Sequence, residues 1–263
     1  MDRRDKYIDI LGMIDLTSLS VSDTRSKISG LVGRVNGFKE RFPDYPLPAS
    51  VCVYPNFAST VAELRNEHSV HVTVVGGTFP ASQSFLEVKL LECIMAVKRG
   101  AEEIDIVLAL NSFLDNRPEE AAEEIRRIGE AVRSVRQDVI LKVILETGEL
   151  SSASIIRDAS FLAMESGADF IKTSTGKTAL SATPDAAQTM CSCIREYFAR
   201  TGRKVGFKAA GGISKAEDAL LYYDIVDSIL GRDWLDKRYF RFGASRLANS
   251  ILTALEGIEV KYY

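Results

Sequence analysis

A lysine at the end of a predicted buried strand lies directly before a turn that suits an anion. Residues 168–172, which end in Lys172, are mostly apolar or β-branched, as expected of a buried strand. Burial disfavours the charged form of a lysine, and a neutral amine attacks carbonyl groups. Residues 173–177 then offer hydroxyls, backbone N–H groups and the ammonium group of Lys177, which suit a phosphate. The stretch indicates a Schiff-base lysine beside an anion site. A strand-end lysine paired with a carboxylate explains it slightly better when it is considered alone.

A second lysine and an aspartate lie within other predicted strands. Alternation of side chains along a strand can turn Asp105, Lys172 and Lys208 toward one interior. Two lysines in one cavity disfavour each other's charge, so the pKa of one amine falls, as in acetoacetate decarboxylase. Asp105 can then move protons, directly or through water. A buried Asp105–Lys208 ion pair without a catalytic role is the open alternative.

The elements that position these residues follow a repeating pattern of strand, polar loop and helix. Eight strands are predicted at residues 10–16, 50–55, 70–75, 103–108, 139–145, 168–172, 205–209 and 239–244. Helices are predicted at about 22–41, 59–67, 84–99, 118–136, 152–166 and 183–202, then from 214 and over 245–256. The pattern predicts an α/β protein, a single-domain (β/α)8 TIM barrel over residues 1–263 with a tail at about 257–263. A doubly wound sheet is disfavoured because no GxGxxG motif follows the first strand.

Two loops predicted at one end of this barrel are suited to a phosphate. Barrel enzymes bind phosphate at the loops after strands seven and eight, and glycines there let the backbone approach an anion. Those loops contain Gly211, Gly212, Gly243 and Ser245. Ser245, like Ser59 and Ser214, is also predicted as a helix N-cap, with Ser214 opening a capping box. On the fifth strand, Lys142 and Glu146 share a face and are predicted to form a supporting pair.

Composition excludes several other classes of protein. The chain of 263 residues carries a formal net charge of -3 and no basic run, which argues against binding to nucleic acid. No apolar run approaches the length of a membrane span, and no signal-peptide pattern follows the charged N-terminus. Four irregularly spaced cysteines and two histidines predict neither a disulfide framework nor a metal site. We therefore expect a cytoplasmic enzyme that uses no metal or cofactor, does not bind membranes, and forms a homodimer or larger homo-oligomer.

Four segments, residues 141–150, 167–177, 205–213 and 241–245, resemble the deoxyribose-phosphate aldolases, and the resemblance extends over nearly the whole chain. These are class I aldolases on a (β/α)8 barrel. The resemblance implies reversible cleavage of 2-deoxy-D-ribose 5-phosphate to D-glyceraldehyde 3-phosphate and acetaldehyde through a lysine Schiff base, in deoxyribonucleotide catabolism. The loop at residues 76–80 and Arg246 depart from the family pattern, which bears on substrate preference and affinity.

The resemblance also implies roles for individual residues. Lys172 is expected to form the Schiff base, Lys208 to lower its pKa, and Asp105 to relay protons. Residues expected to line the site or hold the phosphate are Asp15, Thr175, Gly176, Lys177, Gly211, Gly212, Gly243 and Ser245. Further possible site residues are Cys52, Lys142 and Tyr263. A Tyr263 hydroxyl on a flexible tail could reach the barrel mouth for proton transfer, whereas Cys52 can simply be a small buried side chain.

The residue pattern leaves two other functions open. A phosphosugar isomerase or other barrel lyase would use the same phosphate site without a covalent lysine. A non-catalytic phosphosugar-binding protein would use Lys172 and Lys208 only to neutralise the charge of its ligand.

Overall fold

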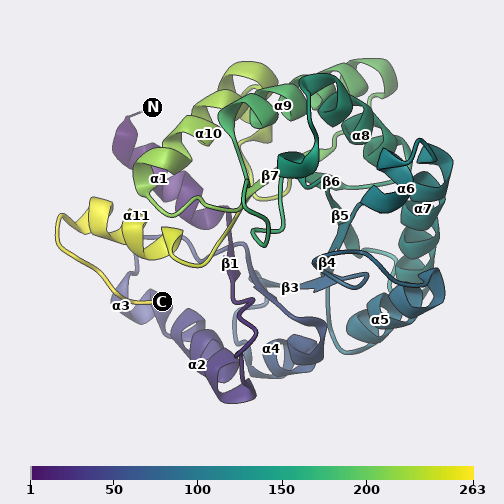
Figure 1. The fold of residues 1–263 in the computed structure, drawn as a ribbon. Helices are drawn as coiled ribbons and strands as arrows, with labels where there is room; N and C mark the ends of the chain where they lie inside the picture. The colour runs from purple at the N-terminus through teal and green to yellow at the C-terminus, as the bar shows by residue number, and fades with distance from the viewer. Residues whose placement is uncertain (1) are drawn as a thin grey trace.

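The computed structural model describes residues 2–263, which form a closed barrel of eight parallel strands surrounded by helices (Figure 1). The strands are β1 (Ile14–Thr17), β2 (Ser50–Val53), β3 (His71–Gly76), β4 (Glu103–Val107), β5 (Ile140–Ile144), β6 (Phe170–Lys172), β7 (Gly206–Ala210) and β8 (Phe240–Ala244). They follow one another in chain order around the barrel, and β8 pairs with β1 to close it. This confirms the predicted (β/α)8 barrel and excludes the doubly wound sheet.

The surrounding helices are α1 (Arg3–Gly12), α2 (Arg25–Asn36), α3 (Phe38–Arg41), α4 (Ala58–Leu64), α5 (Leu86–Lys98), α6 (Leu110–Leu114), α7 (Pro118–Val135), α8 (Ala153–Glu165), α9 (Pro184–Thr201), α10 (Ala216–Leu230) and α11 (Leu247–Glu256). Three short 3-10 helices are η1 (Pro55–Phe57), η2 (Thr147–Glu149) and η3 (Arg232–Trp234). Proline begins α7 and α9 as predicted, and the Thr183 hydroxyl caps α9 by accepting from Ala186 N at 3.2 Å. Within residues 2–263, no helix is long and apolar enough to cross a membrane.

The first predicted strand begins too early, because residues 10–12 are the last turn of α1. The Asp2 side chain caps this helix at its N-terminus. One face of the helix is buried through Tyr7, Ile10 and Leu11. The predicted helix at 22–41 is two helices, since α2 ends at Asn36 and Gly37 separates it from α3. At residues 10–16, the apolar side chains continue from the end of α1 into β1, so the sequence gives no sign of where the helix ends and the strand begins.

Three predicted serine caps are wrong. Helix α4 begins at Ala58 after Phe57, so Ser59 lies inside it. Helices α10 and α11 follow Lys215 and Arg246, and neither helix has a side-chain cap. Ser245 is thus not used as an N-cap and stays in the loop after β8.

Strand β4 shows why the barrel interior is charged. Its five residues are all buried, with Ile104 and Ile106 in the hydrophobic cluster beneath the helices and Glu103 and Asp105 alternating with them. Neighbouring strands are in register so that Asp105 lies beside Lys142, and Lys172 beside Lys208. Alternation and register together bring acidic and basic side chains from separate strands into one interior.

Packing inside the barrel predicts that Gly206 of β7 cannot be replaced by a larger residue without a loss of stability. A Cβ on Gly206 would lie 2.3 Å from the Phe170 ring, whereas a Cβ on exposed Gly33 of α2 would meet nothing within 4 Å. We expect Gly206→Ala to lower the free energy of unfolding by about 1–3 kcal/mol through overpacking. Gly33→Ala should raise it by about 0.5–1 kcal/mol because alanine favours the helix. Urea unfolding measures both, and a Gly206→Ala protein as stable as wild type would contradict this packing.

Candidate active site

A cavity of about 560 Å³ opens at the carboxyl ends of the strands, on the face where barrel enzymes carry their active sites. The loops after β1, β6, β7 and β8 surround it, and Lys172 at the end of β6 reaches it from below. Lys172 is only 4% exposed. A molecule that binds between these four loops would therefore meet one amine, that of the nearly buried Lys172.

Asp105 joins three lysines immediately beneath this cavity. Its carboxylate accepts hydrogen bonds from Lys172 Nζ at 2.8 Å, Lys208 Nζ at 2.7 Å and Lys142 Nζ at 3.0 Å. The lysines come from β5, β6 and β7, and Asp105 comes from β4. Asp105, Lys172 and Lys208, which the sequence pattern directed toward one interior, are thus in direct contact.

The charges around these lysines affect their pKa values in opposite directions. Burial lowers the pKa of Lys172, and the Lys208 cation lowers it further, against the opposing attraction of Asp105. Burial acts in the same direction on Lys208 and Lys142, but their carboxylate neighbours outweigh it and raise both pKa values. Lys172 is therefore the lysine of this cluster that most readily loses its proton.

Asp105 itself is held in the ionised form. Burial opposes its ionisation, but the positive charges of Lys142 and Lys208, with that of Lys172 while it is protonated, outweigh burial and lower its pKa. A carboxylate of this kind is a weak base, so it can pass a proton between neighbouring groups but does not keep one. The cluster thus combines a nucleophile, a fixed cation and a base within hydrogen-bond distance.

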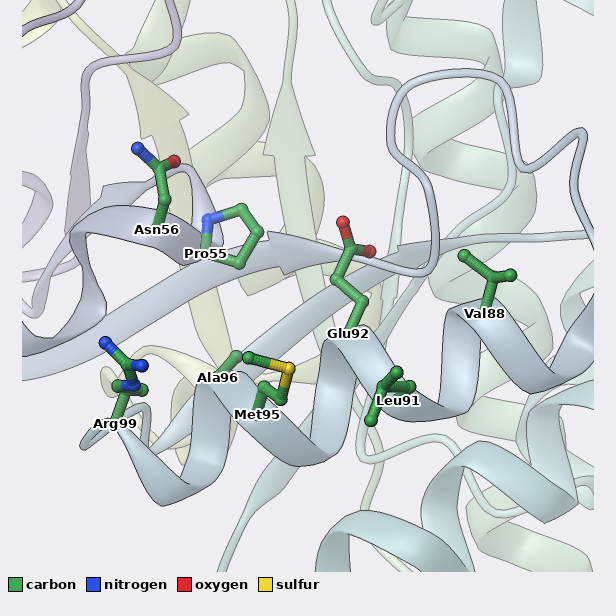
Figure 2. Close-up of a pocket in the computed structure, with 8 residues that line it drawn as sticks. All are labelled: Pro55, Asn56, Val88, Leu91, Glu92, Met95, Ala96 and Arg99. Carbon is green, nitrogen blue, oxygen red and sulfur yellow. The ribbon is translucent and has the colours of Figure 1, made fainter.

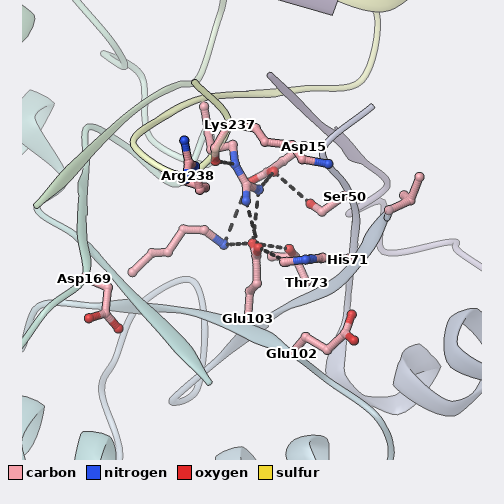
Figure 3. A network of polar contacts seen from close by, with 12 residues as sticks. Asp15, Ser50, His71, Thr73, Glu102, Glu103, Asp169, Lys237 and Arg238 are labelled. Carbon is pink, nitrogen blue, oxygen red and sulfur yellow. Dashed lines mark hydrogen bonds and ion pairs between the residues drawn. The ribbon is translucent and has the colours of Figure 1, made fainter. Parts of the chain in front are cut away.

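A second layer of charges lies deeper in the barrel, around Asp15 and Glu103 (Figure 3). Arg241 of β8 bridges them, with one nitrogen 2.5 Å from Asp15 Oδ1 and the other 2.8 Å from Glu103 Oε1. Lys208 also donates to Asp15, and Lys142 also donates to Glu103. The deeper carboxylates therefore hold the two lysines that in turn surround Asp105.

Neutral donors complete the hydrogen bonding of this layer. The Ser50 hydroxyl donates to Asp15 at 2.8 Å and the Thr73 hydroxyl donates to Glu103 at 2.8 Å. His71 Nδ1 lies 2.7 Å from Glu103 at the amino end of β3. Asp15 is fully buried, with both of its oxygens bonded to protein groups, so it supports Lys208 from below and does not line the cavity.

The predicted Lys142–Glu146 pair is wrong. Lys142 bonds to Glu103 and Asp105, while Glu146 lies beyond the end of β5 with a left-handed φ of 53°. This conformation directs the Glu146 carboxylate to Thr175, which donates both its backbone N–H at 3.1 Å and its hydroxyl. Glu146 therefore fixes the turn after β6, a role that the strand pattern did not indicate.

The residues predicted to hold a phosphate meet around the cavity. They are Thr175, Gly176, Lys177, Gly211, Gly212, Gly243 and Ser245. Gly211 and Gly212 have φ values of 92° and 82°, which other residues rarely adopt, so the β7 loop needs glycine to present its backbone here. Lys177 Nζ donates to Leu19 O at 2.6 Å, which ties the β6 loop to the β1 loop.

Part of the cavity wall was not predicted from the sequence. Ser18, Ser20 and Lys27 from the β1 loop and α2 also line it. Arg246 after β8, already noted in the sequence as a departure that bears on affinity, lines it as well. The signal was present, since the loop after any barrel strand faces this end of the barrel. Lys27, Lys177 and Arg246 make the entrance cationic.

Two further candidates lie apart from the cavity wall. Cys52 is 1% exposed in β2, and burial raises the pKa of its thiol to about 11, so it stays a neutral side chain. The tail carries Tyr263 away from the strands to α3, where its ring stacks on Phe38 with centroids 5.7 Å apart (Figure 1). Asn249 holds the tail there by accepting from Tyr262 N and Tyr263 N.

Arg241 provides a test of the deeper layer. Arg241→Met keeps much of the side-chain volume but removes the cation that bridges Asp15 and Glu103 and leaves one oxygen of each buried carboxylate without its charged donor, so we expect a loss of about 3–5 kcal/mol in stability. Arg238→Met is the matched control because Arg238 is exposed and pairs locally with Asp236, and it should leave stability nearly unchanged. Urea unfolding compares them, and equal midpoints would rule out the bridging role.

Comparison with known proteins agrees with this architecture. The model of the DeoC/LacD family aldolases matches residues 13–229. A Caenorhabditis elegans protein named "Putative deoxyribose-phosphate aldolase" is 39% identical over 254 residues, which are 96% of this chain and 82% of that protein. A solved Toxoplasma gondii structure of the same name covers 97% of both chains at 23% identity with a TM-score of 0.80, which shows the fold. The solved deoxyribose phosphate aldolase of Aeropyrum pernix is 25% identical, covers 97% of this chain and 96% of its own, and has a TM-score of 0.72. The chain belongs to the DeoC/LacD family of aldolases.

Proposed function

We propose that this protein is a class I aldolase that reversibly cleaves 2-deoxy-D-ribose 5-phosphate to D-glyceraldehyde 3-phosphate and acetaldehyde. One observation carries the proposal: of the three clustered lysines, Lys172 alone has a lowered pKa and also lines the cavity. The names of the Caenorhabditis elegans and Aeropyrum pernix relatives support the substrate. The reaction would serve deoxyribonucleotide catabolism in the cytoplasm.

Lys172 begins the proposed reaction as a neutral nucleophile. Its Nζ adds to the aldehyde carbon of the open-chain sugar, and loss of water gives a protonated imine. Asp105, 2.8 Å from this nitrogen and ionised, passes the proton that the attacking amine loses on to the carbinolamine oxygen. One further proton from solvent lets that oxygen leave as water, which gives the protonated imine. Lys208 stays protonated beside them, which keeps the free Lys172 amine neutral.

Bond cleavage then uses the imine as an electron sink. We propose that Asp105, directly or through water, accepts the proton of the hydroxyl at carbon 3 and later returns it to the enamine carbon. Loss of that proton breaks the bond between carbons 2 and 3 and releases D-glyceraldehyde 3-phosphate. The electron pair of that bond forms an enamine on Lys172. Protonation of the enamine carbon and hydrolysis of the resulting imine release acetaldehyde and restore the amine.

The loops around the cavity are suited to the phosphate of the sugar. Gly211 and Gly212 present backbone groups, Ser245 carries a hydroxyl that caps no helix, and Lys177 supplies positive charge. Arg246 and Lys27 add charge at the same entrance. We propose that these groups hold the phosphate while Lys172 attacks the opposite end of the open chain.

Trapping with borohydride tests the covalent step. We expect acetaldehyde plus borohydride to leave a reduced two-carbon adduct on Lys172, located by peptide mass spectrometry. Lys172→Ala should abolish both the adduct and turnover, while Lys39→Ala, at an exposed lysine of α3, should change neither.

Ordinary turnover by Lys172→Ala or Lys172→Arg would point to an isomerase or another lyase without an imine. Binding of phosphosugar without any turnover by wild type would point to a binding protein.

Lys208 provides a test by pH. Lys208→Met removes a cation that helps to lower the Lys172 pKa, so that pKa should rise and the acid limb of kcat/KM should move to higher pH. If the limb moves by about one pH unit, the rate at any pH below both limbs falls about tenfold. The rate should recover partly as the pH is raised. An unchanged profile in a folded variant would contradict this role for Lys208.

A further inference from the structure

A buried glutamate lies directly behind the cavity wall, just beyond the end of β5. Glu146 is 3% exposed, and among residues 2–263 it forms no ion pair. Its carboxylate instead accepts two hydrogen bonds from Thr175, a residue of the wall. The Thr175 backbone N–H donates to Oε1 at 3.1 Å, and the Thr175 hydroxyl donates to Oε2 at 2.5 Å. Since a buried carboxylate is costly unless hydrogen bonds compensate it, these two bonds are what holds Glu146 in place.

The hydrogen bonds around the Thr175 hydroxyl leave it able to do only one further thing. A hydroxyl has one proton to donate and two lone pairs that accept. The proton goes to Glu146, and one lone pair accepts the backbone N–H of Lys177 at 3.0 Å. A carboxylate has no proton to give back, so the bond to Glu146 cannot reverse its direction. Thr175 therefore meets the cavity with one free lone pair and no free proton, which suits a hydroxyl of a bound molecule.

The backbone on both sides of Glu146 keeps this geometry in place. The φ of Glu146 is 53°, a left-handed value that residues other than glycine rarely adopt and that occurs preferentially at functional sites. Thr147 N donates to Thr173 O at 2.9 Å, and a Cβ on Gly148 would lie only 2.1 Å from Leu180 O. The loop after β5 thus packs backbone against backbone on the loop after β6, so Glu146 and Thr175 cannot easily move apart.

A second contact between a glutamate and a threonine shows what is particular to this one. Glu92 lines a hollow of about 450 Å³ between η1 and α5, outside the barrel (Figure 2), and accepts a hydrogen bond from Thr78 N at 2.8 Å. The Thr78 hydroxyl donates instead to Gly77 O at 2.7 Å, and neither Glu92 nor Thr78 lines the cavity at the strand ends. Both glutamates fix a loop, but Glu146 also fixes the direction of a hydroxyl in the cavity wall.

We propose that Glu146 is a positioning residue that makes Thr175 a pure acceptor for the carbon-4 hydroxyl of the sugar, and thereby sets a preference for hydroxylated aldehydes. This inference rests on the proposed function. In that reaction the hydroxyl at carbon 3 gives its proton to Asp105, so the hydroxyl at carbon 4 is the one that remains to donate. It lies between the reacting bond and the phosphate, just as Thr175 lies between Lys172 and Lys177 in the loop that lines the cavity.

Two acceptor aldehydes test this preference in the direction of synthesis, with acetaldehyde as the donor. D-glyceraldehyde 3-phosphate carries the hydroxyl in question, and 3-oxopropyl phosphate is the same molecule without it. Wild type should use the hydroxylated aldehyde with a kcat/KM at least about tenfold higher, because the other leaves the Thr175 lone pair unpaired. In Glu146→Gln the amide can donate to the Thr175 oxygen and release its proton, so the ratio of the two kcat/KM values should fall at least about threefold.

Three further variants or measurements separate this role from a general effect on the fold. Glu149→Gln, at an exposed glutamate of the same loop, should leave the ratio unchanged. Thr175→Val should lower the ratio as Glu146→Gln does, and the double variant should lower it no further, because both changes remove the same contact. Glu146→Gln should still form the borohydride-trapped acetaldehyde adduct on Lys172, since acetaldehyde has no hydroxyl.

Three results would each overturn the role of Glu146. They are an unchanged ratio in folded Glu146→Gln, a further fall of the ratio in the double variant, and loss of the acetaldehyde adduct in Glu146→Gln. A wild type that forms no adduct would instead overturn the proposed function on which this role rests, so the two failures are distinguishable.

Discussion

The structure depends on the balance of charge inside the barrel. Three buried strand carboxylates, Asp15, Glu103 and Asp105, face four buried strand cations, Lys142, Lys172, Lys208 and Arg241. If all seven were ionised, the interior would carry one positive charge in a medium that solvates it poorly. Loss of one proton removes that excess. Arg241 does not lose protons, and Lys142 and Lys208 each bond to two carboxylates. Lys172 bonds to one, so it is the group that gives up a proton most readily. The lowered pKa of Lys172 thus follows from the composition of the whole interior, not from one neighbour.

The barrel makes this balance possible because it brings distant parts of the chain into register. Asp15 and Arg241 are 226 positions apart, and Lys208 and Asp105 are 103 apart. Short strands with an alternating pattern turn every second side chain inward, and the surrounding helices exclude water from the other face. The cost of burying seven ionisable groups is offset because almost every charged atom has an oppositely charged partner or a neutral donor such as Ser50 or Thr73. Rigidity of the cluster follows, since any one side chain that moved would leave another uncompensated.

Local patterns in the sequence were sufficient for the barrel and for most residues around the cavity. Apolar strands that end in Lys172 or in glycine pairs are visible within ten residues, and the barrel rule then places their ends together. The deeper layer of charges could not be predicted from the sequence. Glu103 and Arg241 each resemble an ordinary charged residue at the edge of a strand, and only the register of the folded barrel shows that they pair. The predicted Lys142–Glu146 pair failed for the same reason, because alternation relates only residues along one strand. Lys142 bonds to β4, and Glu146 bonds to Thr175 in the turn after β6. The start of β1 was misplaced because the buried face of α1 runs into the strand without a polar break.

Charge is arranged differently at the barrel mouth than in its interior. Lys177, Lys27 and Arg246 line the cavity with few carboxylates near them, and Asp23 pairs with Lys27. Hydration lowers the energetic cost of placing such partly exposed cations near one another. The chain as a whole carries a net charge of -3, so the positive mouth is a local feature and not a general attraction for anions. Under the proposed function, a phosphorylated sugar would be drawn by its phosphate to these hydrated cations. Its aldehyde would then meet Lys172, the lysine of the interior that most readily loses its proton. The paired charges inside the barrel and the cations at its mouth would in that case orient the sugar along the barrel axis, with its carbonyl at Lys172.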